Sequence, residues 1–209
     1  REDRTALNLR FSLGLARLLK EAKPASDHQL AFARALVTSV ETEAGIAVLR
    51  AYEGDRANRR HKPGRALERP SYRFDVLADY GAFRDLQRHR MLTIEWQRLT
   101  PHHGYTRPEA VDTAGMTERF DAAMARSAEL YEALSGPFPA DASYAVSLAY
   151  RVRFVMQMNA REAMHLIELR TTPQGHPAYR LVGQEMHRLI AEEAGHTAIA
   201  EMMRHVDHS

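Results

Sequence analysis

The stretch "YAVSLAYRVRFVMQMNAREAMHLIELR", residues 144–170, decides the fold because its hydrophobic period changes in the middle. Up to Met158 every even-numbered position is apolar. The odd-numbered positions supply the polar side chains Ser143, Ser147, Arg151, Arg153 and Gln157. A period of two is typical of a strand, so residues 144–158 are predicted to form one long strand with a core face and a polar face. The spacing then becomes helical, which predicts a helix over residues 160–170.

Helices are predicted before the first strand. Apolar residues at helical spacing over residues 7–21 indicate a helix that ends before Pro24. The sequence "SDHQ" that begins at Ser26 has the form of a capping box, with Gln29 as its second partner. It is predicted to open one long helix that continues to about Tyr52.

The segment "EGDRANRRHKPGRALERP", residues 53–70, combines glycines and prolines with many arginines and is predicted to be a loop. We favour a solvated basic loop, since runs of charge are usually solvated, over a lid or an anion clamp. Alternation then predicts a strand over residues 72–76.

The remaining pattern completes the fold prediction. The further expected elements are a short helix over 82–90, a strand over 91–100, and helices over 116–134 and 178–193. Strands separated by so little helix predict an α+β fold, with a largely antiparallel sheet flanked by helices. We expect a single domain over residues 1–209, with an N-terminal helix inside residues 1–25.

Composition narrows the class of protein. The chain has 209 residues, 44% of them hydrophobic, and no cysteine. A disulfide scaffold, a thiolate metal site and a cysteine nucleophile are therefore excluded. Charges interrupt the apolar N-terminal stretch, so neither a signal peptide nor a membrane span is predicted and a cytoplasmic protein is expected.

The balance of charges points to small anionic ligands. The net charge is only +2, which argues against a general nucleic-acid coat protein. Lysine occurs only at Lys20, Lys23 and Lys62, so arginine supplies nearly all the cationic charge. This bias reflects either the base composition of the source genome or the recognition of phosphates and planar heterocycles by planar guanidinium groups.

Two basic clusters stand out. The first is the triplet Arg88-His89-Arg90, and the second follows the long predicted strand. The second cluster consists of Asn159, Arg161, His165 and Arg170. Arg161 and His165 are four residues apart and would share a helix face.

In this order the two clusters resemble motifs of the flavin-dependent thymidylate synthase family. The Arg-His-Arg triplet of that family is intact here as residues 88–90. The later family pattern begins with Asn-x-Arg, which is present as Asn159 and Arg161, and continues here with His165, where the pattern has an asparagine, and Arg170.

The resemblance implies an activity, cofactors and an assembly. It implies a homotetramer with sites at subunit interfaces, which methylates C5 of a uracil nucleotide. Methylenetetrahydrofolate would supply the carbon, reduced FAD the hydride, and NADPH the reduction of the flavin. FAD binding would fall to Arg88, His89, Arg90, Asn159, Arg161 and His165. Arg170 would contact the pyrimidine ring as the catalytic residue, and an arginine there suits a chain without cysteine because it can stabilise developing negative charge.

The segment after the triplet departs from the family pattern. The expected substrate-binding positions are Thr93, Trp96, Arg98, Thr100 and Arg170. Two phosphate-binding arginines of the family are replaced by Thr100 and Ser143. Candidates to replace them are Arg98, Arg151, Arg153, His102, His103 and Arg107. A rebuilt sugar pocket is what acceptance of a ribose hydroxyl would need, so UMP is predicted as a substrate beside or before dUMP. A family relative methylates UMP in biosynthesis of the antibiotic polyoxin.

Two alternatives stay open. One is a non-catalytic nucleotide-binding relative of the family. The other is a di-iron carboxylate protein built on the Glu-x-x-His pairs Glu162/His165 and Glu193/His196. Bridging carboxylates for the irons would come from Glu41, Glu43, Glu129 and Glu132. We favour the hypothesis of a flavin-dependent enzyme, in which no metal is expected, because motifs as short as Glu-x-x-His often match by chance.

Overall fold

The structure is a computed structural model that describes residues 4–40, 43–54 and 56–209. The chain divides into two compact units. The first unit comprises Arg1–Arg73, Gln157–Gly175 and Gly183–Ser209, and the second comprises Phe74–Met156 and His176–Val182.

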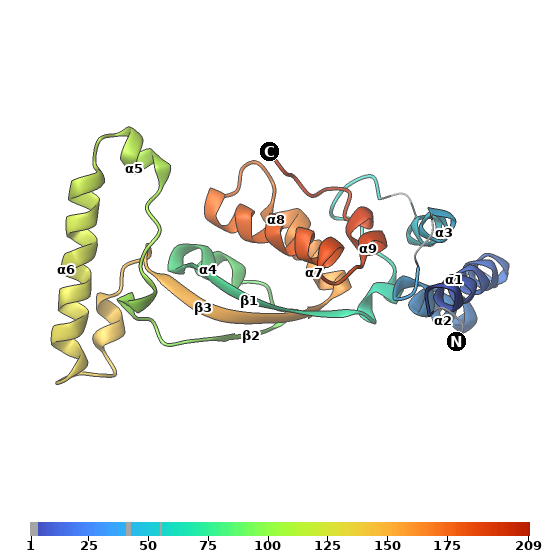
Figure 1. The fold of residues 1–209 in the computed structure, drawn as a ribbon, viewed down its shortest axis with the longest axis horizontal. Helices are drawn as coiled ribbons and strands as arrows, with labels where there is room; N and C mark the ends of the chain where they lie inside the picture. The colour runs from blue at the N-terminus through green and yellow to red at the C-terminus, as the bar shows by residue number, and fades with distance from the viewer. Residues whose placement is uncertain (1–3, 41–42, 55) are drawn as a thin grey trace. The chain divides into compact units, whose positions relative to one another are not determined.

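The strands form an antiparallel sheet, which confirms the predicted α+β class (Figure 1). The described residues form β1 (Ser71–Asp79), β2 (Thr93–Trp96) and β3 (Arg151–Asn159), in the order β1-β3-β2. Alternate residues of β3 are buried, as the period of two predicts. The strand predicted over residues 72–76 is confirmed as β1, whereas β2 is much shorter than the predicted 91–100.

The prediction that the long strand begins at residue 144 is wrong. Ala142–Ala145 form the 3-10 helix η3, and β3 begins only at Arg151. Tyr144 and Leu148 are 89% and 57% exposed, whereas Val146 and Tyr150 are buried, so the alternation of residue types continues here without a regular strand. Local bonds satisfy the start of this segment, for example from the Tyr144 N–H to the Asp141 carbonyl oxygen, 2.9 Å. Further on, the carbonyl oxygens of Leu148 and Tyr150 accept from the N–H groups of Gly81 and Tyr80 at 3.0 and 2.8 Å.

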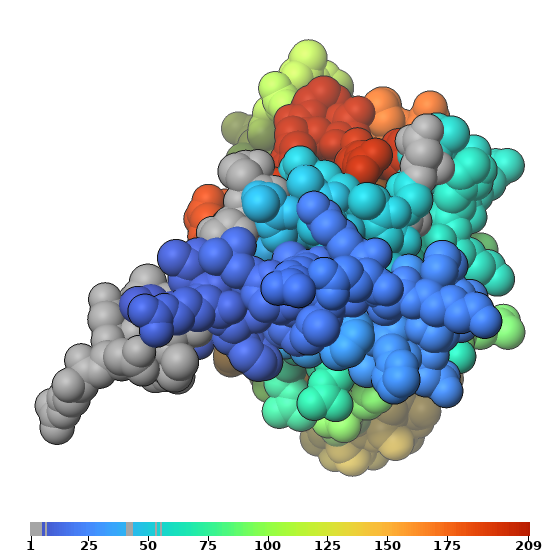
Figure 2. Space-filling view, turned by 90° about the vertical axis from the view of Figure 1, so that its right-hand side faces the viewer, coloured from blue at the N-terminus to red at the C-terminus, as the bar shows by residue number. Residues whose placement is uncertain are grey.

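The N-terminal helices of the first unit pack against one another (Figure 2). They are α1 (Arg4–Glu21), α2 (Asp27–Val37) and α3 (Glu43–Glu53). The single long helix predicted from residue 26 is therefore two helices. Helix α2 ends where the hydroxyls of Thr38 and Ser39 both donate to the Ala35 carbonyl oxygen, at 3.2 and 2.9 Å. The capping box is confirmed, since Ser26 Oγ accepts a hydrogen bond from the Gln29 N–H at 3.1 Å.

The rest of the first unit is built around α7 (Ala160–Arg170), which follows β3 directly. Helix α8 (Pro177–Glu192) belongs to this unit from Gly183 onward, together with α9 (Thr197–Met202) and the 3-10 helix η1 (Arg65–Glu68). The largest fully buried side chains of α7, α8 and α9 are Met164, Leu166, Ile167, Met186, Ile190 and Ile199. Helices α7 and α8 confirm the predictions for residues 160–170 and 178–193.

The second unit contains α4 (Tyr80–Leu86), the 3-10 helix η2 (Pro101–His103), α5 (Glu109–Thr113) and α6 (Thr117–Ser135). Its core cluster consists of Met124, Tyr131, Ala142, Val146 and Tyr150. Helix α6 confirms the prediction for residues 116–134, whereas α5 was not predicted. No helix among the described residues is long and apolar enough to cross a membrane.

Candidate functional site

The Arg-His-Arg triplet lies in the turn that follows α4 in the second unit. Helix α4 is capped by Asp79, whose Oδ1 accepts a hydrogen bond from the Ala82 N–H at 2.8 Å. Phe83 fixes the helix to β3, since its ring centroid is 4.9 Å from that of Phe154. The His89 N–H donates to the Leu86 carbonyl oxygen at 3.2 Å, which holds the triplet against the end of the helix.

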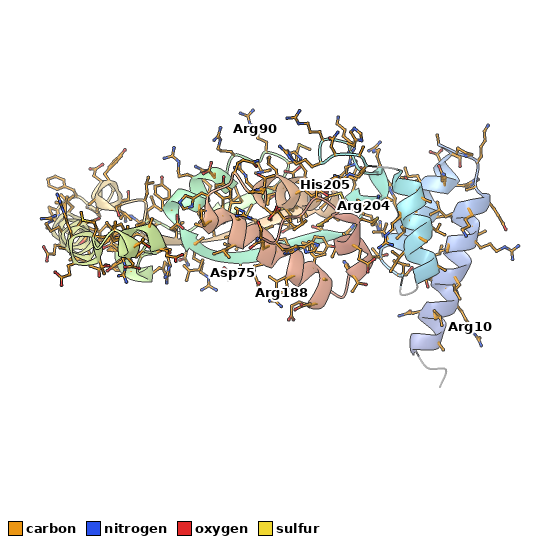
Figure 3. The ribbon with its side chains drawn as sticks, turned by 90° about the horizontal axis from the view of Figure 1, so that it is seen from above. Arg10, Asp75, Arg90, Arg188, Arg204 and His205 are labelled. Carbon is orange, nitrogen blue, oxygen red and sulfur yellow. The ribbon has the colours of Figure 1, made fainter. Side chains whose placement is uncertain are left out.

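The triplet presents its guanidinium groups and buries its imidazole. His89 is buried, whereas Arg88 and Arg90 are exposed. The carboxylate of Asp85 lies 3.6 Å from Arg88. Within the part of the chain that the structure describes, Arg90 has no ion-pair partner, and Figure 3 shows its side chain directed away from the ribbon. The triplet is therefore open to an anionic ligand.

The predicted substrate-binding positions after the triplet lie on or after β2. Thr93 and Arg98 are exposed, and Arg98 has no acidic partner among the described residues. Trp96 is 55% exposed, and its ring lies 5.5 Å from that of Phe83. The Thr100 hydroxyl already has a partner within the chain, because its Oγ1 accepts a hydrogen bond from the His102 N–H at 3.3 Å and caps η2.

Most of the cations proposed to replace the missing arginines have partners. Arg153 is bound to Asp75, with Nη2 donating to Oδ2 at 2.5 Å, and this hydrogen bond lowers the pKa of Asp75. Arg107 pairs with Asp112 at 2.7 Å and with Asp121 at 3.0 Å. Of the other candidates, His102 lies 3.0 Å from Glu132, His103 2.9 Å from Gln97, and Arg151 donates to Thr106 at 3.2 Å. Arg98 is thus the candidate cation that is not engaged by its own chain among the described residues.

The Asn-x-Arg residues lie in the first unit, and both have structural contacts. Asn159 caps α7, since its Oδ1 accepts from the Glu162 N–H at 3.0 Å. Arg161 donates from Nε to the Pro63 carbonyl oxygen at 3.1 Å and from Nη1 to Glu68 at 2.9 Å. Its Nη2 and the amide nitrogen of Asn159 have no bond within the described ranges. These two groups are the donors that an additional ligand can reach.

Glu68 is shared between two arginines. Its carboxylate accepts from Arg161 at 2.9 Å and from Arg65 at 3.1 Å. The hydrogen bond from Arg65, followed by the positive charges of both arginines, keeps the pKa of Glu68 below its ordinary value. An anion that binds Arg161 would therefore compete with the Glu68 carboxylate. Glu68 would keep its ion pair with Arg65 after such a displacement.

The last two residues predicted from the second cluster differ in burial. His165 is exposed on α7, and Arg170, the final residue of the helix, is partly buried. The triplet lies in the second unit and this cluster in the first, so each unit supplies part of the predicted set of FAD-binding residues.

Sequence reasoning missed the buried ion pair of the first unit. Arg56 is 4% exposed and donates to Glu168, which is fully buried at 0%. The prediction of a wholly solvated basic loop over residues 53–70 is therefore wrong at Arg56. One signal in the sequence could have indicated this pair. Glu168 follows Ile167 within the apolar pattern of α7, and a buried carboxylate needs a partner.

Those residues of the di-iron alternative that the structure describes do not form a metal site. Among the described residues, no three histidine or carboxylate side chains are placed to hold a metal ion. Glu41 and the side chain of Glu43 lie outside the described residues. His196 has another contact, since its Nδ1 and the hydroxyl of Tyr72 share a hydrogen bond of 2.9 Å.

The pair of His196 with Tyr72 leads to a prediction about pH. Burial lowers the pKa of His196 in the folded chain and raises that of Tyr72. Because the pKa of histidine in the unfolded chain is about 6.5, acid protonates the unfolded chain first. The stability that the neutral imidazole supplies is then present above about pH 6.5 and is lost as the pH falls.

We expect the melting temperature of the wild-type chain to fall more between about pH 7.5 and about pH 5.5 than that of His196→Gln, whose amide does not titrate. Differential scanning fluorimetry at both pH values measures the difference. Equal losses in the two proteins would contradict this assignment.

Comparison with known proteins places the chain in a family. The sequence model of the thymidylate synthase complementing protein family matches residues 17–195. A UPF0159 protein of Chlamydia muridarum is 37% identical over 186 residues, which cover 89% of this chain and 35% of that protein. A UPF0159 protein of Chlamydia pneumoniae is 43% identical over 148 residues, covering 70% of this chain and 28% of that protein.

A UPF0159 protein of Thermoplasma acidophilum is 36% identical over 173 residues, which cover 82% of this chain and 34% of that protein. The chain thus spans only 28–35% of the length of these curated relatives. The family match, in contrast, extends from α1 to the segment after α8 and includes both basic clusters. The chain therefore belongs to the thymidylate synthase complementing protein family, as the resemblance of its two basic clusters indicated.

Proposed function

We propose that this chain catalyses the flavin-dependent C5-methylation of a uracil nucleotide, UMP, dUMP or both, with methylenetetrahydrofolate as carbon donor. The observation that carries the proposal is the intact Arg-His-Arg triplet after α4, with exposed Arg88 and Arg90, in a member of this family. NADPH as reductant, a homotetramer with sites at subunit interfaces and a cytoplasmic location are parts of the same proposal.

The donor groups available in the two units fit FAD. Arg88 and Arg90 offer exposed guanidinium groups, which form charge-assisted hydrogen bonds with phosphate oxygens. His89 is held at their side, and His165 is exposed on α7. In the other cluster the amide nitrogen of Asn159 and Nη2 of Arg161 remain available. When bound there, FAD supplies the hydride chemistry that amino-acid side chains lack.

The chain's own residues would bind and polarise the nucleotide. Arg170 would direct its planar fork at the polar edge of the uracil ring and stabilise the negative charge that develops there. Arg98 has no acidic partner among the described residues and would neutralise the nucleotide phosphate in place of the missing arginine at Thr100. The exposed indole of Trp96 offers a flat apolar surface for the base or the sugar.

The test of the proposed reaction is a competition assay. Purified protein is expected to be yellow and tetrameric. Given equal UMP and dUMP with methylenetetrahydrofolate, NADPH and FAD, it is expected to form 5-methyluridine monophosphate at least as fast as dTMP. Exclusive formation of dTMP would contradict the UMP preference and leave the reaction class standing, whereas methylation of neither nucleotide would contradict the reaction.

Replacing Arg90 by alanine is expected to lower the flavin content of the purified protein, because a phosphate or ring edge would lose its charge-assisted hydrogen bonds. The expected loss is about 10-fold in FAD affinity, from about 1.5 kcal/mol. Flavin absorbance per chain and titration of the apoprotein measure it. Arg126→Ala removes an exposed arginine of α6 and serves as the matched control. Equal flavin content in both variants would show that Arg90 does not hold the cofactor.

A second candidate is a nucleotide-binding relative without turnover. It is favoured by Thr100, which caps its own helix, and by Ser143, which lies in η3, because both occupy positions of phosphate-binding arginines. This candidate predicts that flavin and UMP bind while no methylated product forms. Single-turnover assays with pre-reduced enzyme distinguish it from the first proposal.

A further inference from the structure

The most deeply buried charges among the described residues belong to Arg56 and Glu168. Their side chains are 3% and 1% exposed. Arg56 donates from Nη1 to Oε1 at 2.9 Å and from Nη2 to Oε2 at 2.5 Å, a bidentate arrangement. Further contacts of Arg56 are Nη1 with Met164 Sδ at 2.9 Å and Nε with the His61 carbonyl oxygen at 3.0 Å. Glu168, Met164 and His61 of the first unit thus meet at one guanidinium.

Stability does not explain why such a pair exists. Two charges lose their hydration on burial, and a well-packed apolar pair of similar volume is often as stable or more stable. What an apolar pair cannot reproduce is direction, because a bidentate guanidinium fixes the plane and the rotation of the carboxylate it holds. The pair therefore fixes the orientation of the Glu168 side chain.

The carboxylate of Glu168 fixes the last turn of α7. Glu168 and Arg170 are two residues apart, which places them about 200° apart around the helix. When Glu168 is held inward, Arg170 is directed to the other side of the helix. Besides Arg56, the N–H of His205 reaches Glu168 at 3.4 Å. The ring Nε2 of His205 lies 3.1 Å from the Arg56 carbonyl oxygen, which closes a cycle of contacts.

The residue after Arg170 is fastened as well. Thr171 donates from Oγ1 to the Ile167 carbonyl oxygen at 2.8 Å and accepts from the Asp207 N–H at 3.1 Å. Gly183 of α8 lies so close that an added Cβ would stand 3.0 Å from Thr171 Cγ2 and 3.9 Å from Arg170 Cβ. Thr171, which follows the last turn of α7, and Gly183, which packs against that turn, therefore leave it little room to move.

We propose that Glu168 is a positioning residue, held by Arg56, that sets the rotation of the last turn of α7 and thereby the direction of Arg170 toward the uracil ring. This inference rests on the proposed function, because it assigns a purpose to the geometry of Arg170. Misplacing a positioned group by about 1 Å costs about 100-fold in rate. A small rotation of the last turn of α7 would therefore be enough to lower the rate through Arg170.

The test replaces the ion pair by an apolar pair, Arg56→Met with Glu168→Leu. The double variant is expected to keep its melting temperature and flavin content, since the volume and packing are retained. Its kcat for nucleotide methylation is expected to fall about 10- to 100-fold. The matched control is Arg188→Met with Glu192→Leu on the exposed face of α8, which is expected to leave kcat unchanged. A double variant with wild-type kcat would overturn the proposal.

A second variant guards against misfolding of the first. Glu168→Asp keeps the charge but retracts it by one methylene, so it is expected to fold and to show a reduced kcat with a nearly unchanged KM. Wild-type kcat in this variant would also overturn the proposal.

Hydrogen exchange gives a readout that does not need turnover. The amides of residues 169–171 are expected to exchange faster in the double variant than in the wild type or the α8 control, and unchanged exchange would overturn the proposal. If the wild-type chain binds flavin but methylates no nucleotide, the proposed function fails on its own. The positioning role is then decided by the hydrogen exchange of residues 169–171.

Discussion

Replacing Glu168 alone by alanine is expected to lower the free energy of unfolding by about 3–5 kcal/mol. The substitution leaves the guanidinium of Arg56 buried without its counter-charge, in a site where Arg56 is 4% exposed. Removing one member of a buried pair is far more costly than replacing both, because the remaining charge keeps its full desolvation penalty. Urea denaturation followed by circular dichroism measures the loss.

The matched control for this prediction is Glu192→Ala. Glu192 accepts a hydrogen bond from Arg188 on α8, but both side chains are largely exposed, at 43% for Arg188 and 59% for Glu192. An exposed pair contributes about 0–1 kcal/mol, so the control is expected to remain close to wild type. A loss for Glu168→Ala no greater than that of the control would show that the pair is solvated in solution.

Replacing Arg170 by alanine is expected to lower kcat/KM for nucleotide methylation by about 100- to 1,000-fold, while flavin content stays at the wild-type level. The reason is that a group which stabilises charge in the transition state is lost, whereas the proposed FAD ligands Arg88, Arg90 and Arg161 remain. Product formation and flavin absorbance are measured on the same preparation.

Arg170→Lys separates this role from a simple positive charge. A lysine ammonium cannot present the two parallel N–H groups of a guanidinium, so little activity is expected to return. Arg188→Ala is the control for loss of a solvent-exposed arginine on α8. Near-normal turnover of the lysine variant would argue that Arg170 is only a surface arginine.

Elements with a clear local signal could be predicted from the sequence. Helices α6, α7 and α8 and strand β1 lie within a few residues of the predicted bounds. Each has a hydrophobic period that matches one type of backbone, and local chemistry marks some boundaries, such as the cap at Ser26. The α+β class followed from the order of these elements, because it depends on their type and spacing.

Elements whose ends depend on a partner could not be predicted in the same way. The alternation from residue 144 to 150 is as regular as that of β3, yet those residues form η3, a turn and an isolated bridge between Tyr150 and Tyr105. A strand needs a neighbour to satisfy its backbone, and periodicity does not report whether one is present. The break between α2 and α3 likewise follows from hydroxyl groups that bond back to Ala35, a competition that apolar spacing does not reveal.

By itself the sequence determined the chemical inventory of this protein: an arginine-rich chain without cysteine, with an intact Arg-His-Arg triplet and an Asn-x-Arg pattern. Only the tertiary structure decided which of those cations are already neutralised. Arg161 and Arg56 are bound to Glu68 and Glu168, partners 93 and 112 residues away, while Arg90 and Arg98 have no acidic partner within the described chain. The reason is physical, because an ion pair depends on distance in space and on burial, and hydrophobic periodicity reports only the local part of burial.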